Sequence, residues 1–259
     1  MTASTPSDHS PATAPGEGDG EKADHPSLYL IPASLGEARP GAGLPEESLR
    51  VARGLRYFIV ENAKSARAEL KRIDIPCPIQ ELDIRELPRA PDQAALDALL
   101  APLASGKSAG LMSEAGAPAV ADPGAPLVRA AHARGITVAP LIGPSSLLLA
   151  LMASGLDGQR FAFHGYLPVR EPERSQRIAA LEKESRREKQ TQIFIETPYR
   201  NAALFAALLA ACRPDAWLCV ASELTTPQES IATRRIDAWR AGPAPMLEKR
   251  PTVFLLLAA

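Results

Sequence analysis

Short apolar segments alternate with helix-forming segments along most of this chain, and this alternation limits the possible folds more than any other feature. Apolar runs occupy residues 28–31, 57–60 and 109–112 of the first half. A short apolar run bounded by breakers or polar residues is typical of a buried strand. Strand–helix alternation implies a largely parallel sheet covered by helices. We therefore predict an α/β fold.

Helix signals separate these runs. Residues 63–72 carry an apolar face at helical spacing. Asp92 is a favourable N-cap for a helix running to about residue 105. Asp122 and Pro123 predict the start of another helix, because proline is favoured at the first helical position.

The second half repeats the alternation, and the two halves meet near residues 142–158. We therefore predict two α/β domains, over residues 27–142 and 143–259. Residues 1–26 are rich in small and polar side chains and bury too little apolar surface to offset the entropy of ordering. We expect them to form a disordered tail. The expected strands of the second half are 161–166, 193–195, 217–221, 231–234 and 252–257, and its expected helices are 147–153, 172–189 and 199–211.

Composition narrows the class of protein. The formal net charge of −1 argues against a general attraction to phosphates, so nucleic-acid binding would need a local patch. Three cysteines and four histidines without metal-ligand spacing indicate no metal, no disulfide framework and a reducing cytoplasm. The N-terminus lacks the apolar core of a signal peptide. No run of about 18 apolar residues predicts a membrane span.

Four loops that follow predicted strands share small residues, a proline, and a hydroxyl or carboxylate. They are residues 32–36, 113–124, 196–200 and 222–227. Turn chemistry alone could explain any one of them. Ligands in open α/β sheets bind beyond the carboxyl ends of strands, however, so four such loops indicate a shared site. Gly116 and its small neighbours would allow close approach to a polar or anionic ligand beside a helix N-terminus.

Six segments, in chain order, resemble motifs of one family. Residues 113–118 and 122–124, Ser-Glu-Ala-Gly-Ala-Pro and Asp-Pro-Gly, resemble the Ser-Asp-Ala-Gly-Thr-Pro…Ser-Asp-Pro-Gly signature of the tetrapyrrole methylase superfamily. The closest branch is that of ribosomal RNA small subunit methyltransferase I. The other matching segments are 28–36, 140–146, 163–168, 196–200 and 221–225.

This resemblance implies a two-domain, class III methyltransferase fold with S-adenosylmethionine in the cleft between the domains. It also implies an RNA substrate, methylated at a ribose 2′-hydroxyl, and commonly a homodimer. The residues expected to bind the cofactor lie in the matched loops or at their strand ends. They are Met112, Glu114, Gly116, Ala117, Val120, Ser145, Ser146, Thr197, Pro198 and Leu224.

Glu61 and Glu223 are the candidate general bases, because methylation of a ribose hydroxyl requires removal of a proton. Either carboxylate could instead pair with a nearby cation, such as Lys64 or Arg200. Glu114 could contact the cofactor or cap backbone N–H groups. One of the two serines at 145 and 146 could serve only as an N-cap.

Departures from the motifs leave two alternatives open. Asn62, Ala117 and Ser222 replace an acid, a threonine and an arginine of the family pattern. These changes would suit a catalytically degenerate protein that still binds S-adenosylmethionine. The other alternative is a methyltransferase for a tetrapyrrole or another small molecule, although the Gly-rich opening of those relatives is absent. The mixed charges of residues 170–189 favour a solvated helix face over an RNA-binding surface.

Overall fold

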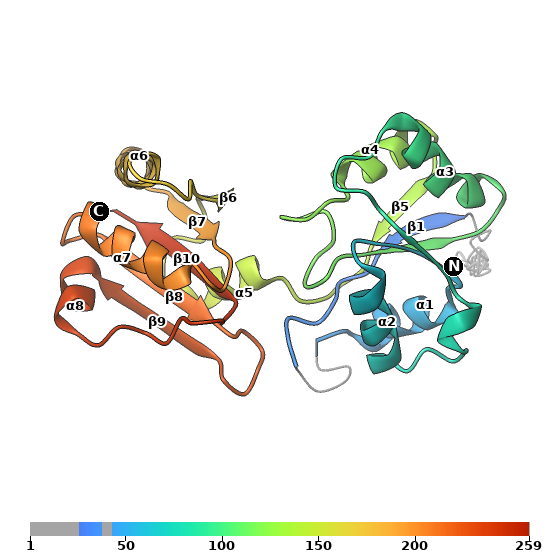
Figure 1. Ribbon diagram of the computed structural model, residues 1–259, viewed down its shortest axis with the longest axis horizontal. Coiled ribbons are helices and arrows are strands. Elements are labelled where there is room, and N and C mark those ends of the chain that lie inside the picture. The colour runs from blue at the N-terminus through green and yellow to red at the C-terminus, as the bar shows by residue number, and fades with distance from the viewer. Residues whose placement is uncertain (1–25, 38–42, 259) are drawn as a thin grey trace, which may run out of the picture.

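The computed structural model describes residues 26–37 and 43–258, which form two α/β halves, each built on a five-stranded sheet (Figure 1). Except for Pro26, the predicted tail lies outside the described residues. The first sheet has the order β3-β2-β4-β1-β5, and every pair in it is parallel, as predicted. Its strands are β1 (Ser27–Leu30), β2 (Tyr57–Val60), β3 (Asp83–Glu86), β4 (Ala109–Met112) and β5 (Thr137–Pro140).

Helices cover both faces of the first sheet. Side chains alternate along β2: Tyr57 and Ile59 pack on one face, whereas Phe58 and Val60 pack on the other. The first face is covered by α3 (Gln93–Ala104) and α4 (Ala125–Ala133), and the second by α1 (Glu46–Gly54) and α2 (Ala63–Arg72). A short 3₁₀ turn, η1 (Ile79–Glu81), precedes β3. Because both faces are covered, all four residues of β2 and of β4 are buried.

Two helices have side-chain caps of the favoured residue types, whereas one predicted helix start is wrong. Asp92 caps α3 as predicted, since its Oδ1 accepts from Ala95 N at 2.8 Å. Asn62 caps α2 by accepting from the backbone of the following turn. The predicted start at Asp122 is wrong, because α4 begins at Ala125 after Gly124. Gly124 has a φ of +152°, which other residues rarely adopt, so the chain turns there before the helix starts.

The second sheet has the order β6-β7-β10-β8-β9 and is mostly antiparallel. Only β6 and β7 are parallel, so the expectation of a largely parallel sheet is wrong for this half. The last strand, β10, inserts between β7 and β8. Residues 223–229, which connect β8 to β9, are too few for a parallel crossover. The strands are β6 (Phe161–Tyr166), β7 (Thr191–Ile195), β8 (Trp217–Ser222), β9 (Ser230–Arg235) and β10 (Thr252–Leu257).

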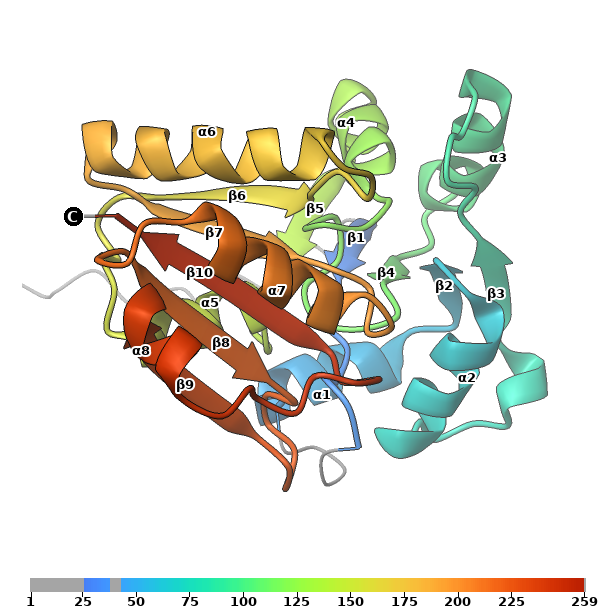
Figure 2. The ribbon, with the colours of Figure 1, turned by 60° about the vertical axis from the view of Figure 1, so that its left-hand side comes forward.

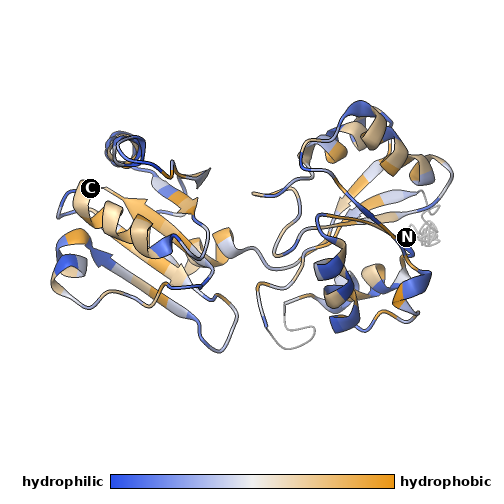
Figure 3. Cartoon of the chain, viewed as in Figure 1, coloured by the Kyte–Doolittle hydropathy of each residue, from blue (hydrophilic) through white to orange (hydrophobic). Residues whose placement is uncertain are grey.

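Different helices cover the two faces of this sheet. One face packs against α5 (Ser146–Ser154), and the other against α6 (Glu173–Glu188), α7 (Asn201–Ala211) and α8 (Ile236–Ala241). The contacts of α5 with β8, β9 and β10 attach it to the second sheet. Figure 3 shows that α5 and α7 are largely apolar, whereas α6 is almost wholly hydrophilic.

The strand directions bring three carboxyl ends of the second sheet to one edge. Both β7 and β8 run antiparallel to β10 and therefore parallel to each other, and β6 is parallel to β7. Figure 2 shows β6 and β8 pointing toward the first half and β10 pointing away from it. The expected meeting of loops therefore occurs at this edge, although the sheet is mixed.

Candidate cofactor cleft

A cleft of about 570 Å³ lies between the two halves, and both of them line it. The first half contributes Ser34, Leu35, Gly36, Glu37, Ser65, Ala68, Glu69, Arg72, Glu114 and Ala115; the second contributes Ser146, Tyr166, Ile195, Glu196, Pro198, Ala221, Leu224, Pro251, Thr252 and Val253. A smaller recess of about 120 Å³ shares Ala115, Ser146 and Ile195 with the cleft. Both spaces lie at the carboxyl ends of strands, where the sequence predicts a ligand site.

Most residues expected to bind the cofactor line one of these two spaces. Glu114, Ser146, Pro198 and Leu224 line the cleft. The recess is lined by Gly116, Ala117, Val120 and Ser145, together with Ser146.

Two expected residues lie elsewhere. Met112 is buried in the core between α2 and the first sheet and lines neither space. Thr197 lines neither space either, and its backbone N donates to Glu196 Oε1 at 2.7 Å. Ser145 is the N-cap residue of α5, but its hydroxyl makes no capping hydrogen bond.

Three carboxylates meet where β2 and β4 end, and we call Glu61, Glu114 and Asp122 the acidic corner. Glu61 Oε2 accepts from Glu114 N at 3.3 Å, and Ser65 Oγ donates to Glu114 Oε1 at 3.1 Å. Burial raises the pKa of Asp122 to about 6, and the charges of Glu61 and Glu114 add to the rise against the lowering effect of the Ser113 hydroxyl. Asp122 also lines the recess, so an acid that titrates near neutral pH faces this space.

The two predicted bases follow strands of different halves of the chain. Glu223 follows β8 with a φ of +53°, and its backbone N donates to Pro251 O at 3.0 Å. Within the described part of the chain, no hydrogen bond or ion pair joins Glu61 to Glu223, and neither residue lines the cleft or the recess. Arg200 pairs with Glu196 at 2.6 Å rather than with Glu223.

Glu69 on α2 binds the loop of residues 32–36, a role that was not predicted from the sequence. Its Oε1 accepts from Ser34 N at 3.1 Å and from Ser34 Oγ at 2.7 Å. Arg72 pairs with Glu69 at 3.4 Å and donates to Gly36 O at 2.7 Å. Glu69 is buried beside Leu70, and a carboxylate on the apolar face of a helix is the signal that could have revealed it.

Leu35, at the centre of this loop, connects the two halves. It packs against the core cluster of the second half that contains Leu224 and Val253. Gly116 leaves room for the Leu35 side chain, since a Cβ added at position 116 would lie 3.2 Å from Leu35 Cδ2. Backbone hydrogen bonds of 2.9 Å in both directions join Ala33 to Gly116. The small residue at 116 therefore allows two loops to meet, in addition to lining the recess.

Two departures from the family pattern have structural roles. Asn62 caps α2, with its Oδ1 accepting from Lys64 N at 2.9 Å and from Ser65 N at 3.1 Å. Ser222 is buried on β8, and its hydroxyl shares a hydrogen bond of 2.9 Å with the hydroxyl of Thr252, which lines the cleft. Both side chains are therefore hydrogen-bonded within the structure.

Comparison with known proteins decides the family. The family model for tetrapyrrole (corrin/porphyrin) methylases matches residues 52–238. The chain belongs to the tetrapyrrole methylase family. It is 30% identical to ribosomal RNA small subunit methyltransferase I of Escherichia coli O157:H7, over 79% of this chain and 67% of that protein. It is 32% identical to the protein of the same name from Xylella fastidiosa, over 79% of this chain and 71% of that protein.

A solved tetrapyrrole methylase-like structure supports the fold. The crystal structure of the methyltransferase CobJ aligns with a TM-score of 0.56 at 18% identity, covering 83% of this chain and 88% of that one. Tetrapyrrole methylases and the matched ribosomal RNA methyltransferases use S-adenosylmethionine. This chain is therefore a methyltransferase that depends on S-adenosylmethionine.

The cleft suits that cofactor in size and chemistry. Its volume lies within the range of about 300–1,000 Å³ that is usual for small-molecule sites. The second half contributes the apolar side chains of Ile195, Leu224 and Val253, which suit an adenine ring. The opposite side carries Glu114 and Ser34, whose oxygens suit hydroxyl and ammonium groups.

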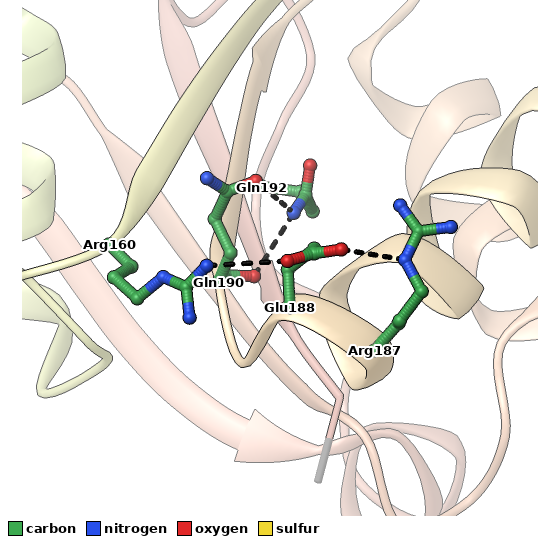
Figure 4. Close-up of polar contacts among 5 residues, drawn as sticks. All are labelled: Arg160, Arg187, Glu188, Gln190 and Gln192. Atoms are coloured by element: carbon green, nitrogen blue, oxygen red, sulfur yellow. Dashed lines mark hydrogen bonds and ion pairs between the residues drawn. The ribbon is translucent and has the colours of Figure 1, made fainter.

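The charged helix α6 forms a solvated face, as its mixed charges predict. At its C-terminal end, Glu188 pairs with Arg187 at 2.7 Å and with Arg160 at 3.3 Å (Figure 4). Arg187, and to a lesser extent Arg160, lowers the pKa of the Glu188 carboxyl. These local pairs neutralise cations that would otherwise be available to phosphates.

Residues 26–37 and 43–258 contain neither a cluster of metal ligands nor a membrane-spanning helix. No group of three or more His, Cys, Asp or Glu side chains there could hold a metal ion. No helix in the same ranges combines the length and apolarity needed to cross a membrane.

Proposed function

We propose that this methyltransferase acts on RNA and transfers a methyl group from S-adenosylmethionine to a ribose 2′-hydroxyl. The observation that supports this most is the acidic corner beside the apolar cleft wall, which puts candidate bases next to a fitting cofactor cleft. Identities of 30–33% to ribosomal RNA small subunit methyltransferases I, over about four-fifths of the chain, favour RNA as the substrate.

The proposed base comes from the pair Glu61 and Asp122. A base works best when its pKa lies near the working pH, and Asp122 has a pKa of about 6 and lines the recess. Glu61, expected as a base from the sequence, adjoins Asp122 and holds Glu114 through a backbone hydrogen bond. Glu223 has weaker support, because it contacts neither of these carboxylates in the described structure.

In this proposal the carboxylate accepts the proton of the 2′-hydroxyl while the oxygen forms a bond to the methyl carbon. Bound S-adenosylmethionine supplies an electrophilic methyl group, whose bonding pair leaves with the sulfur. The apolar wall of Ile195, Leu224 and Val253 would exclude water and orient the adenine. Glu114 and Ser146, on opposite sides of the cleft, would bind polar groups of the cofactor, and Gly116, Ala117, Val120, Ser145 and Pro198 would complete its surroundings.

We also propose a cytoplasmic homodimer. Three large apolar side chains, Ile142, Leu148 and Met152, are exposed on or just before α5. Leu148 and Met152 stand four residues apart and so share one face of a helix that is apolar all round. A second copy of the chain would bury this face. Met152→Glu should convert the dimer to a monomer in light scattering, and a wild-type monomer would refute the proposal.

The test is methyl transfer to small-subunit ribosomal RNA from a strain that lacks this protein. Purified protein with methyl-labelled S-adenosylmethionine should produce one 2′-O-methylated nucleoside, detected by mass spectrometry of digested RNA. Asp122→Asn should keep cofactor affinity but lower kcat about 100-fold or more. Absence of any labelled nucleoside, with a cofactor-binding protein, would refute RNA as the substrate.

A further inference from the structure

Two exposed tyrosines follow or end neighbouring strands beside the cleft. Tyr199 is 81% exposed and Tyr166 is 57% exposed. Among the described residues, Phe161 is the other aromatic side chain exposed to a comparable degree, at 42%, and it begins β6 whereas Tyr166 ends it. A protein normally buries such rings for their large apolar area, so two of them beside the cleft suggest a binding surface.

The strand topology explains why both tyrosines lie beside the cleft. Tyr166 is the last residue of β6 and pairs in register with Ile195, the last residue of β7. Tyr199 follows in the turn between β7 and α7, next to Pro198. Tyr166, Ile195 and Pro198 all line the cleft. Tyr166 therefore lines the cleft, and the exposed Tyr199 follows directly after a residue that lines it.

A fixed cation accompanies them. Glu196 is buried, and its Oε1 accepts from Arg200 Nη2 at 2.6 Å. The Arg200 side chain is 41% exposed and lies near Tyr166. A guanidinium held in this way offers a flat, positively charged surface beside an aromatic ring, which suits a base or a phosphate.

Charge determines which kind of contact can supply RNA affinity here. The whole chain has a formal net charge of −1, Glu114 lines the cleft and Asp122 lines its recess, with Glu61 beside them. These carboxylates repel phosphates, so the RNA backbone has to remain at the rim. Stacking of bases on aromatic rings needs no net positive charge and tolerates any sequence.

We propose that Tyr166 and Tyr199 form a stacking surface for an unpaired RNA base, with Arg200 contacting the adjoining phosphate. This inference rests on the proposed function and specifies its substrate: a nucleotide that is unpaired or extruded from structured RNA, rather than one within a duplex. The base stacks at the rim, and its ribose then faces the cleft and the acidic corner. Unstacked bases are the usual targets of sequence-tolerant recognition by aromatic side chains.

The experiment measures binding of a fluorescently labelled, unpaired oligoribonucleotide by anisotropy, with saturating S-adenosylhomocysteine. The same oligoribonucleotide annealed to its complement serves as the duplex probe. Tyr166→Ala and Tyr199→Ala should each weaken binding of the unpaired probe about 5- to 100-fold, the range expected for loss of one stacked base. Tyr→Phe at either position should restore affinity to within about twofold, since the ring is retained.

Phe161→Ala is the matched control, because it removes an exposed ring from the opposite end of β6. It should leave the affinity unchanged. Alanine variants at 166 and 199 that bind like the wild type would overturn the inference, and so would equal losses from Phe161→Ala. A change in molecular mass on Tyr199→Ala would assign the ring to a subunit interface and would also overturn it.

Methyl transfer measured in parallel separates this inference from the proposed function. If the wild type methylates RNA and both alanine variants keep its KM, the stacking surface is wrong while the function stands. If the tyrosines bind unpaired RNA but the wild type transfers no methyl group to it, the proposed function is wrong while the stacking surface stands. A raised KM for RNA with intact kcat at saturating RNA supports both.

Discussion

The two halves reach the cleft by different architectures and contribute different chemistry to it. The first sheet is wholly parallel, and its half contributes the carboxylates of Glu69, Glu114 and Asp122 to the cleft or its recess. The second sheet is mostly antiparallel, and its half contributes apolar side chains that include Ile195 and Val253. Three of its strands, β6, β7 and β8, still present their carboxyl ends to the cleft, because β10 separates β7 from β8 without reversing either.

This contrast separates two ways of building a site. On the polar side, the buried carboxylate of Glu69 binds the loop that contains Ser34 through hydrogen bonds whose loss would strongly destabilise the loop. On the apolar side, Ile195, Leu224 and Val253 belong to or pack against the core of their half, so close packing fixes their positions. Leu35 connects them, since it belongs to the loop held by Glu69 and packs on the second core.

The largest effect is expected from Glu69→Ala. The change removes two hydrogen bonds to Ser34 and leaves Arg72 without its carboxylate. The free energy of unfolding should fall by about 3 kcal/mol, because hydrogen bonds to charged groups contribute about 1.5–3 kcal/mol each. Chemical denaturation measures this, with the exposed Glu81→Ala as control. A loss below about 1 kcal/mol would show that the loop does not depend on Glu69.

Ile195→Ala tests the apolar side. Ile195 lines both the cleft and the recess, so its truncation should weaken S-adenosylmethionine binding about tenfold. Ile231→Ala is the matched control, because Ile231 packs partly buried on the same core cluster without lining the cleft. Both variants should lose similar stability, and only Ile195→Ala should lose affinity in calorimetry. Equal affinity losses would mean that the wall acts only through folding.

Asp122→Asn should have a smaller, pH-dependent effect. The pKa of Asp122 rises from 3.8 to about 6, so the folded protein binds this proton more tightly than the unfolded chain. The resulting stabilisation is present below about pH 4 and is lost as the pH rises through 6. At pH 8 the free energy of unfolding of the variant should exceed that of the wild type by about 1 kcal/mol. This value is smaller than the full pKa shift implies, because solvent screens the partly exposed carboxylate.

Thermal denaturation at pH 4 and at pH 8 measures this difference. The two proteins should have similar stability at pH 4 and differ at pH 8. An Asp122→Asn variant that is less stable than the wild type at pH 8 would show that the carboxylate is ionised and well solvated in the folded state.

Local signals predicted much of the fold, including the cap at Asp92 and the short strands of the first half. They did not reveal β3, because an exposed edge strand with one apolar residue, Ile84, resembles a loop. The antiparallel order of the second sheet depends on where β10 inserts, which no local pattern encodes. Helix α1 was also missed, since its charged sequence has few apolar residues.

The candidate site, like the fold, could be predicted only in part from local sequence signals. Motif residues such as Glu114 and Ser146 line the cleft, because short loops stay close to the strand ends that they follow. Met112 is instead in the core, since β4 is buried on both faces and the sequence cannot tell which side chains point toward the loop. Glu69 was missed because its partner, Ser34, lies 35 residues away in the sequence.

The smallest effect is expected on the surface of the second half. Arg187 is exposed and pairs with Glu188 at the end of α6. Arg187→Ala should leave the midpoint of urea denaturation unchanged within error, because exposed ion pairs contribute little to stability. Urea denaturation at low and at high salt tests this, and a clear fall in the midpoint at both salt concentrations would give Arg187 a structural role in α6 beyond solvation.

The most direct measurement is a calorimetric titration of the wild-type protein with S-adenosylmethionine, with S-adenosylhomocysteine and ATP as comparison ligands. A cleft built jointly by the two halves predicts saturable binding of the first two ligands, one per chain, and little binding of ATP. Glu69→Ala and Ile195→Ala, which alter opposite halves, should both weaken it. A folded wild-type protein that binds neither S-adenosylmethionine nor S-adenosylhomocysteine would contradict the assignment of the cleft as the cofactor site.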